Sequence, residues 1–179
     1  MSDPTIPLSV VSSVYSPSHW LQIAIGKNVM QPQPPPTTQG YWFVVLDRRT
    51  LQVVFNQFQA SGNVAPNIGG FNTTDYMLVV STTGVGLNNQ PQGDLFKFLD
   101  LNGAGRQLRH IDQIAAQFNC GSLRTFGYAL VSVLGNLNQP GFELSQISNP
   151  NTGPFLTVQL MSTVIAGVTY YTPIELSNA

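Results

Sequence analysis

Few side chains in this sequence could act as acids, bases or nucleophiles, and none has the spacing of a catalytic motif. The chain has one cysteine, Cys120, and two histidines far apart, His19 and His110. A thiol acts as a nucleophile when a base lies beside it, and His110 precedes Cys120 by ten residues with no pattern that joins them. We interpret Cys120 as a small buried residue, with a nucleophile facing His110 as the alternative.

The acidic residues predict neither a metal site nor a catalytic carboxylate pair. The four candidates for a pair share no recognisable spacing, and each lies beside a loop or helix cap: Asp75, Asp94, Asp100 and Asp112. The segment 100–109 lacks the alternating acidic ligands of an EF-hand loop, and no zinc-binding pattern or phosphate-binding glycine loop occurs. We therefore predict that the protein is not an enzyme and holds no metal or cofactor.

Composition limits the partners that the protein can have. Only 8% of its 179 residues are charged, against roughly 25% in an average soluble protein. The five arginines and two lysines are scattered, whereas nucleic-acid binding needs clustered basic residues, so we expect no nucleic-acid partner. Fourteen asparagines and fifteen glutamines make the surface polar but nearly uncharged. Such a surface suits sugars, weak polar contacts or association with copies of the same chain.

Neither a secretory signal nor a membrane span is predicted. Residues 1–13 contain no basic segment and no long apolar stretch, and no run of about 18 apolar residues occurs elsewhere. A single cysteine allows no internal disulfide. We therefore expect no membrane partner, and a location in the cytoplasm or export by a non-classical route.

The elements that position these residues are mostly β-strands. Runs with a period of two, or with continuous apolar residues, indicate strands, whereas 106–119 has the spacing of an amphipathic helix. The predicted fold is α+β in a single domain, 1–179, with mostly antiparallel sheets arranged like a sandwich, one main helix and short flanking helices. The predicted strands are 8–15, 19–30, 41–46, 51–58, 76–82, 128–134, 155–165 and 168–176.

The predicted helix has one apolar face, which we expect to pack against the strands 76–82 and 128–134. A glycine, Gly121, follows it where a left-handed cap is common. The apolar face consists of Leu108, Ile111, Ala115 and Phe118.

A charged turn, residues 47–50, joins the strands 41–46 and 51–58. Asp47 favours the start of a turn, and four residues suit a hairpin loop. We interpret Arg48 and Arg49 as solvated turn residues. The alternative is that they form one polar wall of a ligand surface.

The order of these segments resembles that of the interleukin-like EMT inducer domain, also called the PANDER-like domain, over residues 38–145. The resemblance is carried by a strand–turn–strand opening, a central strand, a helix and a closing strand. Their sequences are GYWFVVLD, LQVVFNQFQ, DYMLVVSTTG, AAQFNCGSLR and GYALVSVLG. Residues 1–37 and 146–179 then form N-terminal and C-terminal β extensions.

This resemblance implies two facing antiparallel sheets with short helices at the flank. Members of the family include secreted signalling proteins, and a related domain in the stem of an O-mannose glycosyltransferase binds sugar. Arg124 matches the family's basic residue before the closing strand, whereas the acidic residues usual after the second and central strands are absent. The implied ligand-binding candidates are Arg124, Gln59, Asp75 and Trp42, with a core position as the alternative for Trp42.

The function we predict is a non-catalytic binding module that recognises a carbohydrate or a protein. The alternative is a structural protein that assembles into a homo-oligomer or filament. In that case residues 1–30 and 155–176 would add strands to the sheet edge of a neighbouring copy, and the other possibility is that both segments pack on their own core.

Overall fold

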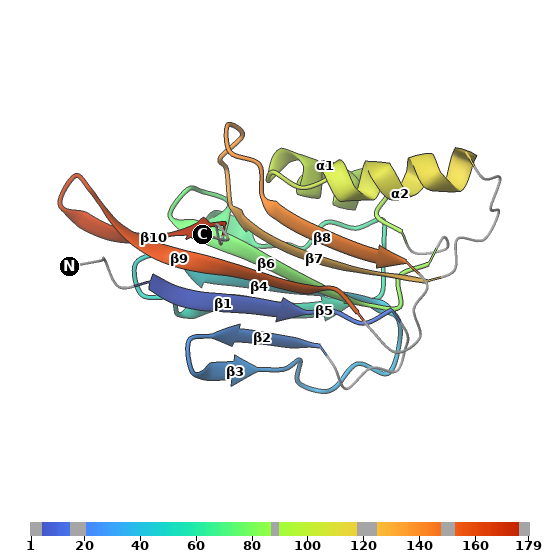
Figure 1. Ribbon diagram of the computed structural model, residues 1–179, viewed down its shortest axis with the longest axis horizontal. Helices are drawn as coiled ribbons and strands as arrows, with labels where there is room; N and C mark the ends of the chain where they lie inside the picture. The colour runs from blue at the N-terminus through green and yellow to red at the C-terminus, as the bar shows by residue number, and fades with distance from the viewer. Residues whose placement is uncertain (1–4, 15–20, 87–89, 118–124, 148–152, 176–179) are drawn as a thin grey trace.

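The computed structural model describes residues 5–14, 21–86, 90–117, 125–147 and 153–175. These residues form two five-stranded sheets of antiparallel strands with few helices (Figure 1). The predicted predominance of antiparallel strands is confirmed. The α+β and sandwich descriptions fit only coarsely, because the helices lie on the outer face of one sheet and add a third layer.

The first sheet is built from both ends of the chain. Its order is β10-β9-β1-β2-β3, and β1 pairs with β9 so that Leu8 lies opposite Val158. The prediction of one strand over 19–30 is wrong, because the chain turns back at Gly26, whose φ of 57° suits a tight turn. The strands are β1 (Thr5–Val11), β2 (Gln22–Ile25), β3 (Asn28–Met30), β9 (Phe155–Ile165) and β10 (Val168–Ile174).

The second sheet has the order β5-β4-β6-β7-β8 and lies in the middle of the molecule. The hairpin predicted around residues 47–50 is confirmed as the connection from β4 to β5. The last strand, β8, was not among the predicted strands, because its sequence FELSQI mixes polar and apolar residues without a clean alternation. The strands are β4 (Gly40–Asp47), β5 (Val53–Gln59), β6 (Tyr76–Thr83), β7 (Phe126–Val133) and β8 (Phe142–Ile147).

Two hydrophobic cores lie on opposite faces of the second sheet. On one face, Trp42, Val79 and Val131 pack against residues of the first sheet such as Val10 and Leu160. On the other face, alternate residues of the same strands pack against the helices. Because the strands β4, β6 and β7 are buried on both faces, they have continuous apolar sequences instead of an alternating pattern.

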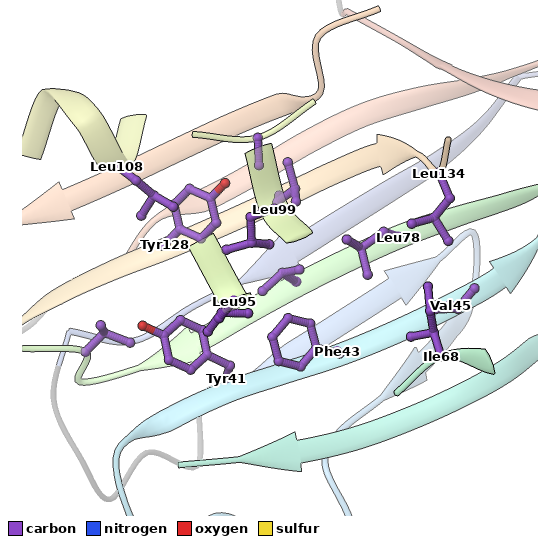
Figure 2. Close-up of a cluster of buried hydrophobic side chains, with 14 of the residues drawn as sticks. Tyr41, Phe43, Val45, Ile68, Leu78, Leu95, Leu99, Leu108, Tyr128 and Leu134 are labelled. Atoms are coloured by element: carbon purple, nitrogen blue, oxygen red, sulfur yellow. The ribbon is translucent and has the colours of Figure 1, made fainter. Parts of the chain in front are cut away.

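The helical layer contains α1 (Gly93–Leu101) and α2 (Arg106–Gln117), and a short 3-10 helix, Gly69–Phe71, precedes β6. Leu108 and Ile111 of α2 are buried in the core over β6 and β7, as predicted, and Figure 2 shows Leu108 beside Tyr128. Phe118, the side chain of Ala115 and the expected cap Gly121 lie outside the described residues.

The loop between β9 and β10 allows a direct test of backbone strain. It consists of Ala166 (φ 50°) and Gly167 (φ 81°), so both residues occupy the left-handed region that a type I′ turn requires. Most residues with a Cβ are disfavoured there. Glycine is tolerated because it has no Cβ, and asparagine because its short polar side chain can form local hydrogen bonds. We expect Ala166→Asn to raise the free energy of unfolding by about 0.5–1 kcal/mol, which thermal denaturation would show as a rise in Tm of roughly 2 °C.

Gly167→Ala is the matched control for that substitution. A Cβ at Gly167 meets no atom within 4 Å, so the substitution strains the backbone without causing a steric clash. We expect it to lower the free energy of unfolding by about 1 kcal/mol. If both variants shifted Tm in the same direction, this account of the turn would be wrong.

Candidate functional site

Arg48 is buried, although the sequence predicted a solvated turn residue, and that interpretation is wrong. Only 7% of Arg48 is exposed. Its backbone N–H donates to the carbonyl of Asp75. Arg48 therefore extends β4 by one residue beside the start of β6. Arg49 does lie in solvent, with 46% of its side chain exposed, and it pairs with Asp47 at 2.9 Å. Hydrogen bonds from Arg49 hold the pKa of Asp47 below its usual value.

The Arg48 side chain joins the β9–β10 hairpin to the second sheet. Its Nε donates to the Tyr171 carbonyl at 2.9 Å, Nη1 to the Thr74 carbonyl at 2.5 Å, and Nη2 to Thr172 Oγ1 at 2.7 Å. The N–H of Tyr171 donates in turn to the Arg48 carbonyl at 2.7 Å. A guanidinium has five N–H donors, so these bonds fix the group in place and leave two donors for a further partner.

Tyr170 and Asp75 stand beside this guanidinium. The Tyr170 hydroxyl donates to Asp75 Oδ1 at 3.1 Å, and the Arg48 guanidinium carbon lies 5.4 Å from the centre of the Tyr170 ring. The hydrogen bond to Asp75 raises the pKa of Tyr170, whereas burial lowers the pKa of Arg48. Within the described chain, no carboxylate lies within 4.0 Å of the Arg48 nitrogens, so no direct ion pair neutralises this buried cation.

These side chains line an open pocket of about 380 Å³. It lies where the β9–β10 hairpin, which extends past the rest of the first sheet in Figure 1, meets the β4, β6 and β7 ends of the second sheet. The pocket offers N–H donors, a carboxylate, two amides, hydroxyls and one aromatic ring. Its lining residues are Arg48, Thr74, Asp75, Val133, Asn136, Gln139, Ile165, Tyr170 and Thr172.

The three predicted ligand-binding residues that the structure describes do not come together. Asp75 lines the pocket, whereas the Gln59 amide donates to the carbonyls of Ser61 and Val64 in the loop after β5. Trp42 has no exposed surface, and its Nε1 donates to Asn56 Oδ1, so its ring presents no face to a ligand. Arg124 lies outside the described residues.

His110 is not among the residues that line this pocket. His110 is exposed on α2, and His19 and Cys120 lie outside the described residues. Sequence reasoning gave Arg48 only as an alternative, together with Arg49, and missed Asn136, Gln139, Tyr170 and Thr172. No signal in the sequence separated Arg48 from Arg49, because the predicted strand ended at residue 46 whereas β4 ends at Asp47.

A second charged group, Glu143 of β8, is buried and has a structural role. Only 1% of its side chain is exposed. Its carboxylate accepts hydrogen bonds from the backbone N–H groups of Gly105, Arg106 and Gln107 at 3.0–3.4 Å, and from the Tyr128 hydroxyl at 2.9 Å. It thereby caps the first turn of α2, where a negative charge is favourable. Burial and Glu143 both raise the pKa of Tyr128, which keeps its hydroxyl a donor.

Buried hydroxyls join β1 to the second sheet. Ser12 Oγ donates to the Tyr128 carbonyl at 2.6 Å, and Ser81 Oγ donates to the Val11 carbonyl at 2.7 Å. Thr82 Oγ1 accepts from the Tyr128 N–H at 2.8 Å. These bonds satisfy backbone groups where β1 crosses the end of β6, so the polar residues at the end of this buried strand stabilise the fold.

Comparison with known proteins adds no assignment. No protein-family model matches the chain, and no curated protein matches it significantly. Within the described ranges, no group of three His, Cys, Asp or Glu side chains could hold a metal ion, and no helix is long and apolar enough to cross a membrane.

Proposed function

We propose that the chain is a non-catalytic binding module and that the pocket around Arg48 binds a neutral carbohydrate. One observation carries the proposal: a buried arginine, an aspartate, two amides and a tyrosine ring converge on one open pocket. Sugars present hydroxyl groups that donate and accept, together with apolar C–H faces.

The charges in the pocket favour a neutral ligand. Arg48 would oppose a cation and Asp75 would oppose an anion, whereas a hydroxyl can donate to Asp75 and accept from the two remaining N–H groups of Arg48. Asn136 and Gln139 each add one donor group and one acceptor group. The half-buried Tyr170 ring adds an apolar surface for the C–H groups of a sugar, and binding sites combine apolar and polar groups in this way.

The lining residues also support binding without catalysis. Asp75 is the one carboxylate among the described residues that line the pocket, and no histidine or cysteine lines it. Glycoside hydrolysis typically uses two carboxylates on either side of the scissile bond. A lone carboxylate that accepts a hydrogen bond from Tyr170 suits recognition of a hydroxyl.

A glycan array followed by titration of the best ligand tests this proposal. Asp75→Asn keeps the size of the side chain but removes its charge, so we expect the affinity to fall about tenfold, the loss typical of one hydrogen bond to a charged group. Asp94→Asn, on the exposed first turn of α1, is the matched control and should bind normally. Absence of glycan binding at millimolar concentration, or equal affinity of the Asp75→Asn variant, would refute the proposal.

A further inference from the structure

The four edges of the two sheets differ in how they are protected. An unpaired edge strand exposes backbone N–H and C=O groups to other chains, and proteins block such edges with prolines, charges, short strands or covering elements. The edge strands here are β10 and β3 in the first sheet and β5 and β8 in the second. Three of them are well protected, whereas β5 has only a β-bulge near its start, where Val53 and Phe55 pair with the neighbouring residues Leu46 and Val45.

The edge of β10 is closed by Arg48 and by a proline. Both backbone groups of Tyr171 that point away from β9 are occupied, since its N–H donates to the Arg48 carbonyl and its carbonyl accepts from Arg48 Nε. The next outward position is Pro173, which has no N–H. The expectation that edges of the terminal extensions would be available for association is therefore not met at β10.

The edges at β3 and β8 are protected in other ways. β3 has three residues, Asn28–Met30, and is followed by the Pro-rich segment 31–36. β8 carries the buried carboxylate Glu143 and is contacted by both α2 and β9. A short strand and a covered strand offer few free backbone groups in a row.

β5 (Val53–Gln59) is the exception. Its sequence VVFNQFQ contains no charge, no proline and no glycine, and it has seven residues, as strands that pair between chains commonly do. In the described part of the chain, it pairs only with β4. Asn56 and Gln57 are exposed, and 42% of Val53 is exposed. Beyond the bulge, from Phe55 to Gln59, the strand carries no charge and no proline that would oppose pairing with another strand.

We propose that β5 pairs antiparallel with β5 of a second copy of this chain. Antiparallel pairing of a strand with itself has two-fold symmetry, so each contact forms twice. A second copy fits because β5 is uncharged and brings no like charges opposite one another, and the net charge of −1 gives little repulsion between whole chains. The two five-stranded second sheets would then form one continuous sheet. This inference is independent of carbohydrate binding.

A charge exchange at Gln57 tests the pairing. Gln57→Lys and Gln57→Glu each place like charges near the two-fold axis, so at low ionic strength each variant should raise the dimer dissociation constant about five- to tenfold. An equimolar mixture of the two variants should restore association, because opposite charges then meet. Sedimentation equilibrium of the wild-type protein, each variant and the mixture measures this, and circular dichroism checks that each variant is folded.

Gln113→Lys on the exposed surface of α2 is the matched control, and it should associate like the wild-type chain. The proposal is overturned if the wild-type protein is a monomer up to high concentration. It is also overturned if the Gln57 variants associate as well as the wild type, or if Gln113→Lys weakens association equally. Failure of the mixture to associate would likewise count against pairing through β5.

Discussion

Replacing Ile111 with aspartate is expected to unfold the protein. Ile111 is 3% exposed and belongs to the core that joins α2 to the second sheet, together with Leu108 and Leu130. The substitution removes buried aliphatic contacts and places a carboxylate without a partner in an apolar site. We expect a loss of more than about 4 kcal/mol, which is most of the stability of a typical domain. Urea denaturation followed by circular dichroism measures it.

Two controls separate burial from helix propensity. Ile111→Val keeps the site apolar and should cost about 1 kcal/mol. Gln113→Asp introduces the same carboxylate two residues later, at an exposed position of the same helix, and should cost less than about 1 kcal/mol. If Ile111→Asp unfolded cooperatively at nearly the wild-type urea concentration, the helical layer would not be packed as described.

Glu143→Ala is expected to cost about 3 kcal/mol, since it leaves several donors, most of them partly buried, without their acceptor. The affected groups are the Tyr128 hydroxyl and the N–H groups of Gly105, Arg106 and Gln107. The substitution should lower the stability of the whole protein and also loosen the first turn of α2, because Glu143 binds the N–H groups of that turn. Urea denaturation measures the total, and hydrogen exchange should show faster exchange of the amides at 105–107 than in the wild-type protein.

Tyr128→Phe provides the control for that substitution. It removes one donor and leaves the carboxylate cap of α2 in place, so we expect a smaller loss of about 1 kcal/mol. The double variant should lose less than the sum of the two single variants, because they share one hydrogen bond. Additive losses, or unchanged exchange at 105–107, would contradict the role assigned to Glu143.

Arg48 has one role at a sheet edge and another at the pocket. Its backbone carbonyl and Nε occupy the outer groups of Tyr171 and so close the edge of β10. Arg48 also lines the pocket beside Asp75 and Tyr170. The same residue therefore protects an edge of the first sheet and contributes to a polar site, whereas β5, an edge of the second sheet, stays largely open.

The sequence alone determined the elements whose signals are local. Continuous apolar runs identified β6 and β7, the spacing of Leu108 and Ile111 identified α2, and Asp47 identified the turn from β4 to β5. These signals depend on residues within one or two turns of a helix, or on successive residues of one strand. Neighbours along the chain therefore suffice to specify them. The boundaries were less well determined, as the break at Gly26 and the strand β8 show.

Only the tertiary structure decided the candidate site and the open edge. From the sequence, a turn arginine next to an aspartate has no visible reason to be buried. Its partners Thr74, Tyr171 and Thr172 lie 26, 123 and 124 residues away along the chain. Of the predicted site residues that the structure describes, Asp75 alone lines the pocket, because a pocket is made by segments that the sheet order brings together. The charges and prolines of an edge strand are visible in its sequence, but whether a neighbour covers that strand depends on packing.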